Sequence, residues 1–303
     1  MKVFCYLLLV VAIMGLPACS EDDPVEPPDP PDPPPTPTLA YAGSDACLPC
    51  HQEEYDAWKD SGHASAMTAV AGASPDTACS GFAAFAKDPA VPPAGHDWDD
   101  VSFVIGGYGW KMNWLDVEGY LISGDDAQYN FQDGSRVAYP IEGAPGNRPF
   151  TCGRCHATGW VDKHAGKAGV DLPGSTGTFF AAGVHCEECH GMGSFHVAEP
   201  DSNRMTVDRT SEACARCHRR MPDDAIAAAD GFVRTYQQYS EWKASPHGGL
   251  GPGCNDCHDP HASAHFEEAA ATGFILSCEG CHPGFDDFDD HTTEVSCVEC
   301  HMR

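Results

Sequence analysis

Cys186-Glu187-Glu188-Cys189-His190 is one of several copies of a single five-residue pattern, Cys-x-x-Cys-His, in this chain. The copies are numbered I to VII in chain order: Cys47-Cys50-His51, Cys152-Cys155-His156, Cys186-Cys189-His190, Cys214-Cys217-His218, Cys254-Cys257-His258, Cys278-Cys281-His282 and Cys297-Cys300-His301. Histidine makes up only 16 of the 303 residues, so its recurrence directly after the second cysteine in every copy is not accidental. The pattern therefore indicates one repeated piece of chemistry.

The spacing within the pattern is typical of covalent haem c attachment. Cysteines at positions i and i+3 lie on one face of a helical turn, so both sulfurs reach the two vinyl groups of one porphyrin. The histidine that follows supplies the proximal nitrogen to the iron. Structural zinc sites and disulfides also use paired cysteines, but neither requires a histidine at this position. The sequence therefore predicts seven covalently bound haem c groups.

The first residues of the chain predict a secreted lipoprotein. Lys2 precedes a short apolar run, and residues 1–18 have the layout of a secretory signal peptide. The run is too short for a membrane span, which needs about 20 apolar residues. Leu16-Pro17-Ala18-Cys19 is similar to a bacterial lipobox, which predicts that Cys19 is lipidated and begins the mature chain. An ordinary signal peptide followed by a coincidental cysteine is the alternative.

Residues 19–40 are predicted to be a tether. Nine of the fourteen residues from Pro24 to Pro37 are proline, a composition that favours an extended, semi-rigid polyproline II segment. Ser20, in place of an aspartate after the lipidated cysteine, argues against retention at the inner membrane. We therefore expect an outer-membrane lipoprotein, on either the periplasmic face or the cell surface.

The formal net charge of −28 narrows the choice of partners. Nucleic-acid binding requires a basic surface, so it is excluded. An acidic surface would steer basic redox partners or cationic metal species towards the protein, and it would equally keep a haem-rich protein soluble.

The motifs divide the chain into two predicted regions. Residues 41–150 hold motif I and a segment with short strands at 101–105, 110–115 and 120–122, separated by glycine-containing turns. Residues 151–303 hold the other six motifs and a predicted helix over 223–242, ending before Pro246. The predicted fold class is mostly α with little regular secondary structure, plus a small antiparallel β element near residues 100–123.

Three further patterns accompany the motifs. Trp58-Lys59-Asp60-Ser61-Gly62-His63 matches Trp242-Lys243-Ala244-Ser245-Pro246-His247 at four of six positions. Two motifs are followed closely by another histidine, in Cys257-His258-Asp259-Pro260-His261 and in Cys189-His190-Gly191-Met192-Gly193-Ser194-Phe195-His196. These strings resemble the Trp-x-x-Ser-x-His, Cys-His-Asp-Pro-His and Cys-His-Gly-x-Gly-x-x-His motifs of the multihaem cytochrome c superfamily. That superfamily includes tetrahaem cytochromes of nitrifiers, hydroxylamine oxidoreductases and the outer-membrane and filament cytochromes of metal-reducing bacteria.

The resemblance covers about residues 41–303 through its motifs alone, and it implies distal iron ligands. They are expected at His63, His196, His247, His261 and His291. His164 and His265 are the next candidates, and they complete the seven that bis-histidine ligation of every haem would need. His96 and His185 are the remaining non-motif histidines, and ligation by Met67, Met192 or Met205 is a competing arrangement.

Filled axial positions leave no iron open to a substrate, which predicts an electron relay and not an enzyme. A domain of this length is small enough to keep neighbouring haem edges within tunnelling reach. The expected partners are other cytochromes, with ferric iron or mineral oxidants as further acceptors, and the membrane through the lipid. Two alternatives stay open: a reductase of a small nitrogen or sulfur oxyanion at an open haem, and a subunit of an extracellular cytochrome filament, which would make the chain an oligomer.

Overall fold

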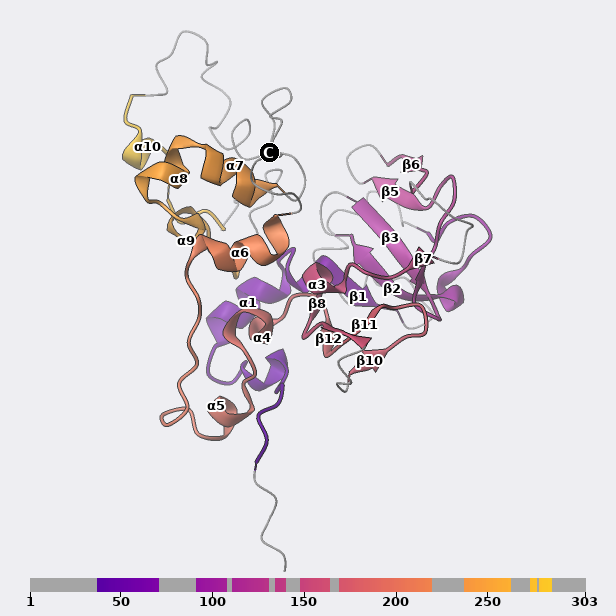
Figure 1. Ribbon diagram of the computed structural model, residues 1–303, viewed down its shortest axis with the longest axis horizontal. Coiled ribbons are helices and arrows are strands. Elements are labelled where there is room, and N and C mark those ends of the chain that lie inside the picture. The colour runs from indigo at the N-terminus through magenta and orange to yellow at the C-terminus, as the bar shows by residue number, and fades with distance from the viewer. Residues whose placement is uncertain are drawn as a thin grey trace, which may run out of the picture. The chain divides into compact units, whose positions relative to one another are not determined.

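The computed structural model describes residues 37–70, 91–107, 111–130, 134–139, 148–163, 169–219, 237–262, 273–276 and 278–284 (Figure 1). The chain divides into two compact units, Met1–Thr38 and Leu39–Arg303. All helices and strands named below belong to the second unit. Motifs I to VI lie within the described residues, and motif VII lies outside them.

An antiparallel sheet is the largest element group in the described part of the second unit. Its seven strands are β1 (Met67–Ala69), β2 (Val101–Gly106), β3 (Lys111–Asp116), β4 (Tyr120–Leu121), β5 (Gln128–Asn130), β6 (Arg136–Val137) and β7 (Arg148–Pro149). The order is β1-β2-β3-β4-β7, and β5 pairs with both β3 and β6. The central register places Val104 opposite Trp114, and a bulge interrupts it between Val101 and Phe103.

Both faces of this sheet are buried. Successive side chains of a strand point to opposite faces, so Trp114 and Leu115 of β3 face opposite ways, and both are fully buried. Each belongs to a separate apolar cluster. The Trp114 cluster contains Val101, Val104, Met112, Ile122 and Tyr129. The Leu115 cluster contains Met67, Ile105, Leu121, Phe150, Ala157 and Phe179.

The Leu115 cluster connects the sheet to motif II. Phe150 and Ala157 flank the motif in sequence, and Cys152 packs against the cluster. Two smaller antiparallel sheets lie in the same stretch of chain: β10-β11-β9 and β12-β8. Their strands are β8 (Ala157–Thr158), β9 (Val161–Asp162), β10 (Val170–Asp171), β11 (Gly177–Phe179) and β12 (Ala181–Ala182). Motif II is thus held on a β framework.

The helices are short, and most of them carry a motif or a candidate ligand. The α-helices are α1 (Gln52–Lys59), α3 (Gly153–His156), α4 (Cys186–His190), α5 (Ser194–Ala198), α6 (Ser211–His218), α7 (Gln238–Ala244), α8 (Pro246–Leu250), α9 (Cys254–Cys257) and α10 (Cys278–Cys281). The 3-10 helices are η1 (Ser44–Ala46), η2 (Ala64–Ala66) and η4 (Trp98–Asp100). In the residues that the structure describes, no helix has the length and apolar character needed to cross a membrane.

The predicted fold class, mostly α with a small β element, is wrong. Strands β2, β3 and β4 do occupy the predicted region, paired antiparallel. However, they belong to a larger sheet that also includes residues 67–69, 128–130, 136–137 and 148–149. Most of the added strands have two or three residues, too few to show an alternation of apolar and polar side chains.

The predicted helix over 223–242 can be compared with the structure only at its end. Residues 220–236 lie outside the described residues, and α7 runs over Gln238–Ala244, before Pro246.

Candidate haem-binding sites

Each described motif closes one turn of helix. In motifs I, II, V and VI, the histidine N–H donates to the carbonyl oxygen of the first cysteine, at 2.9–3.2 Å. Motifs III and IV lie within α4 and α6. Two cysteines and a histidine therefore project from a single turn, as the spacing predicts. The twelve cysteines of motifs I to VI are free of disulfides.

Four motif histidines face a candidate distal histidine from elsewhere in the chain. The ring centres are separated by 6.4 Å for His51 and His196, 6.2 Å for His218 and His63, 6.3 Å for His190 and His261, and 5.8 Å for His282 and His247. All four candidates are among those implied by the family resemblance, and the structure adds which motif each one faces.

These separations fit an iron held between two imidazoles. Two imidazoles bound to opposite sides of one metal through bonds of about 2.0–2.1 Å bring their ring centres to roughly 6 Å apart. The ring planes range from nearly parallel, at 20° for His190 and His261, to steeply inclined, at 69° for His63 and His218. Each imidazole can rotate about its metal–nitrogen bond and remain bound, so both angles between the ring planes are compatible with axial ligation.

Hydrogen bonds fix the orientation of the candidate distal rings. The Nδ1 atom of His63 lies 2.9 Å from the carbonyl oxygen of Pro260, and that of His196 lies 3.0 Å from the carbonyl oxygen of Asn203. The Nδ1 atom of His261 lies 2.9 Å from a carboxylate oxygen of Asp259. A donating Nδ1–H leaves Nε2 with its lone pair, the arrangement that metal-binding histidines usually adopt.

The two Trp-x-x-Ser-x-His copies adopt matching turns. In each, the serine N–H donates to the tryptophan carbonyl, at 2.9 Å for Ser61 and 3.0 Å for Ser245. Each indole N–H donates to a distant backbone carbonyl oxygen: Trp58 to Val184 at 2.8 Å and Trp242 to Pro252 at 2.9 Å. The repeat therefore holds His63 and His247 in place by the same local geometry.

Two described motif histidines face no other imidazole among the described residues. His156 of motif II has Nδ1 2.8 Å from the carbonyl oxygen of Ala66, which orients its ring as for the distal histidines. His258 of motif V lies against Phe274, with ring centres 4.7 Å apart. His164, His265 and His291 lie outside the described residues, so no distal candidate is placed opposite these two motifs.

His185 and His96 are not placed as ligands. Both ring nitrogens of His185 have hydrogen-bond partners, with Nδ1 2.8 Å from the Ser44 hydroxyl and Nε2 2.8 Å from the Ala182 carbonyl oxygen. The ring of His96 lies 3.9 Å from the carboxylate of Asp100. Met67 is buried in the Leu115 cluster, where it fills apolar space.

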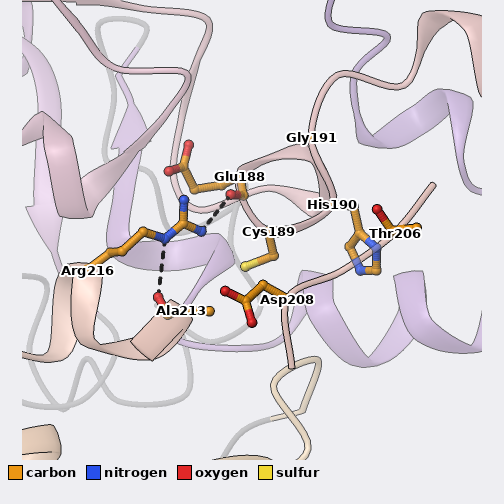
Figure 2. A pocket seen from close by; sticks show the side chains of 8 residues that line it. All are labelled: Glu188, Cys189, His190, Gly191, Thr206, Asp208, Ala213 and Arg216. Carbon is orange, nitrogen blue, oxygen red and sulfur yellow. Dashed lines mark hydrogen bonds between the residues drawn. The ribbon is translucent and has the colours of Figure 1, made fainter. Parts of the chain in front are cut away.

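A cavity of about 410 Å³ opens beside motif III (Figure 2). Cys189 and His190 of α4 line it on one side, and Ala213 and Arg216 of α6 line it on another. Arg216 donates to the carbonyl oxygens of Ala213 and Glu188, at 3.2 Å in each case, which joins α6 to α4 across the cavity. Cys189 and His190 are the two lining residues that would hold a haem at motif III.

The electrostatics of the rings favour metal binding. Burial lowers the pKa of His63, His156 and His190, because the apolar surroundings penalise the charged imidazolium. The neutral imidazole is the form that binds a metal. Among the described residues, no group of three or more His, Cys, Asp or Glu side chains is placed so that it could hold a metal ion.

Glu187 is a site residue that the sequence analysis missed. Its side chain is only 3% exposed, and its carboxylate accepts hydrogen bonds from the backbone N–H groups of Ala42, Gly43 and Gly193 at 2.7–2.8 Å. It occupies a variable position of motif III, so the motif itself carries no signal for it. The acceptor role is visible only once residues far apart in sequence are brought together.

Comparisons with known proteins agree with this geometry. The sequence matches the family described as cytochrome c554 and c-prime over residues 46–81 and 138–191, which include motifs I to III. No curated protein matches the chain.

Three solved structures match the chain, and two of them have TM-scores of 0.50 and 0.51. An undecahaem cytochrome from the S-layer of Carboxydothermus ferrireducens is 19% identical, with a TM-score of 0.50, covering 82% of this chain and 43% of that one. The octahaem sulfite reductase MccA of Wolinella succinogenes is 17% identical, with a TM-score of 0.51, covering 87% and 54%. The outer cell wall cytochrome OcwA is 20% identical, with a TM-score of 0.40, covering 81% and 47%. The chain therefore spans about half the length of the solved structures that it matches.

Three kinds of likeness point to the same class of protein. The chain is similar to multihaem c-type cytochromes in its repeated Cys-x-x-Cys-His motifs, in the two segments that match the cytochrome c554 and c-prime family, and in its fold, and this likeness supports covalently bound haem c.

Proposed function

We propose that this chain is an electron relay with seven covalent haem c groups, each iron held by two histidines. The observation that carries the proposal is the set of four facing imidazole pairs, His51–His196, His218–His63, His190–His261 and His282–His247. Two imidazoles on one iron occupy both axial positions, so a substrate has no place to bind. Bound haem supplies the reversible one-electron chemistry, and the chain supplies ligands, spacing and a shielded environment.

The remaining ligands follow from the count of histidines. Motif histidines His156, His258 and His301 have no described imidazole partner. His164, His265 and His291 are the distal candidates left over, and we propose that they serve these three haems.

The relay is proposed to work outside the cytoplasm, on a chain anchored by lipid at Cys19. The lipobox-like sequence and the proline-rich residues 24–37 support this location. The S-layer source of one cytochrome of similar fold is in keeping with it. Its proposed partners are redox proteins such as other cytochromes, with ferric iron or mineral oxidants as terminal acceptors, attracted or steered by the acidic surface.

Intact mass spectrometry and ferric spectra of the secreted holoprotein test the proposal together. We expect the mass of seven haems, a low-spin ferric spectrum that cyanide and nitrite leave unchanged, and a ferrous spectrum that CO leaves unchanged. A high-spin haem that binds CO, accompanied by steady-state reduction of nitrite or sulfite, would replace the relay with the reductase. A mass equivalent to fewer haems would refute the assignment of at least one motif.

A further inference from the structure

Helix α6, which carries motif IV, is bonded to three other motif helices. Figure 1 shows α6 between α9 and α3, and hydrogen bonds connect it to α3, α4 and α9. Each connection involves a motif residue or its immediate neighbour. The three contacts therefore decide how the cofactors of four sites are arranged.

Motif II meets motif IV through their second cysteines. Sγ of Cys155 lies 4.0 Å from the carbonyl oxygen of Cys217, and Sγ of Cys217 lies 3.7 Å from the carbonyl oxygen of Arg154. A second contact lies on the distal side. The carbonyl oxygen of Ala66 lies within hydrogen-bond distance of Nδ1 of His156. Ala66 is in the same 3-10 turn as His63, which faces His218.

Motif III meets motif IV on two sides as well. Arg216 of α6 donates to the Glu188 carbonyl oxygen of α4 at 3.2 Å (Figure 2). On the distal side, His63 bonds the carbonyl oxygen of Pro260, the residue directly before His261, which faces His190 of motif III. The axial ligands of the two sites are thus joined.

Motif V meets motif IV through its first cysteine. The backbone N–H of Cys254 donates to the Ser211 hydroxyl of α6 at 3.1 Å. The side chain of Asn255 adds a bond to the carbonyl oxygen of Arg209, at 3.2 Å.

Motif I lies at the end of an arm that reaches motif IV through motif III. The Cys186 thiol of motif III lies 3.3 Å from the hydroxyl of Ser44, which precedes Cys47 by three residues. Motif VI similarly adjoins motif V, where the N–H of Ile275, just before α10, donates to the Cys257 carbonyl oxygen at 3.0 Å.

We infer that, among the six described sites, site IV is the junction of a branched haem chain, with one arm through sites III and I, a second through sites V and VI, and a third formed by site II. Each thioether sulfur is joined to the porphyrin edge through a single carbon, so motif turns in direct contact would bring two porphyrin edges close together. The inference rests on the proposed relay and deepens it, because it assigns the order in which electrons pass between the sites.

The test is a ligand exchange that marks the junction haem. His63→Met replaces the imidazole facing His218 with a thioether, which raises the reduction potential of that haem above the others. Reduction with dithionite to the point where only this haem is ferrous makes it diamagnetic. Electron paramagnetic resonance then reports which ferric neighbours lose a spin-coupled partner.

His196→Met is the matched control, because it makes the same exchange at site I, the end of an arm. We expect the signals of three other ferric haems to change in His63→Met. We expect the signal of one other ferric haem to change in His196→Met. An equal number of changed signals in the two variants would overturn the junction. A wild-type spectrum without low-spin haems would instead overturn the relay itself, so the two failures are distinguishable.

His63→Ala provides a second measurement if methionine does not bind the iron. CO then binds the vacated axial position of the ferrous haem and keeps it diamagnetic, and the same comparison with His196→Ala applies. CO binding that changes no more ferric signals in His63→Ala than in His196→Ala would again refute the junction.

Discussion

At the scale of single residues, the partners of the ring nitrogens separate two kinds of histidine. His63, His196 and His261 use Nδ1 for a hydrogen bond and direct the rest of the ring at a motif histidine. His185 uses both nitrogens within the protein. The family resemblance made the same division, but the hydrogen-bond partners that explain it cannot be read from single histidines close to a motif.

His247→Ala should open one haem. His247 faces His282, and its loss leaves that iron with a single protein ligand. We expect one haem to become high-spin and CO-reactive while the others stay low-spin, measured by optical and resonance spectroscopy.

His185→Ala is the control for this variant, since neither ring nitrogen of His185 is available to a metal. It should leave the spin state of every haem unchanged. A new high-spin component in His185→Ala, or none in His247→Ala, would contradict the assignment of ligands.

Glu187→Gln should destabilise the holoprotein. The buried carboxylate accepts three backbone hydrogen bonds, and an amide would turn a donor towards at least one N–H group. We expect a loss of about 1–3 kcal/mol in the free energy of unfolding, measured by denaturant titration.

Glu199→Gln serves as the comparison, because Glu199 is exposed. Its effect should be about 0.5 kcal/mol or less. Equal effects of the two substitutions would show that the Glu187 contacts do not stabilise the fold.

At the scale of elements, the motif helices are too short to be stable alone. They contain four to eight residues, whereas isolated helices need about 12–15 to be even marginally stable. Their packing against neighbours, and the attached cofactor, must supply the difference. Motif II shows this most clearly, since Gly153 of α3 lies against the ring of Trp160, and both Trp160 and Cys152 pack against the Leu115 cluster.

Gly153→Ala should disturb this packing. A Cβ atom at Gly153 would lie 2.0 Å from Cε3 of Trp160, which itself packs in the Leu115 cluster. We expect the free energy of unfolding to fall by about 1–3 kcal/mol, the usual cost of overpacking.

Gly249→Ala makes the same chemical change in α8, where nothing lies within 4 Å of the added Cβ. It should be neutral or stabilising by up to about 1 kcal/mol, because alanine favours a helix. Calorimetry of the two variants decides the point: similar losses in both would show that Trp160 does not restrict position 153.

The sequence could predict those elements whose side chains have an obligatory spacing. The motif turns and the strands β2, β3 and β4 fall in this class, since a covalent cofactor or a run of apolar side chains dictates them. The small sheets around residues 157–182 could not be predicted, because strands of two or three residues are specified by their pairing partners. The pairing of motif histidines with distal histidines could not be predicted either, because only the tertiary fold brings residues such as His63 and His218 together.

At the scale of the whole molecule, the sites differ in their surroundings, so their potentials should differ. Site II lies on a buried apolar cluster, whereas His51 of site I is exposed. Axial ligands, hydrogen bonds and solvent exposure together set the potential of a haem. Sites with the same ligands should thus cover a range of potentials.

A potentiometric titration of the holoprotein should therefore be broad and lie mostly at negative potentials. Several overlapping one-electron waves are expected, followed by optical absorbance. A single sharp wave at positive potential would contradict bis-histidine ligation of the described sites. Stopped-flow mixing with soluble ferric iron should show fast oxidation, and mixing with nitrite should not.

The contacts of Ala40 and Glu187 also determine how the protein responds to mechanical load. Ala40 forms two hydrogen bonds with Ser194, and Glu187 holds the N–H groups of Ala42 and Gly43. A pulling force on the chain before Ala40 is thus borne first by α4 and the start of α5, not by the β sheet. Stretching this end would shear those bonds and shift the Cys186–His190 turn, so tension would be felt at a redox centre before any part of the sheet gives way.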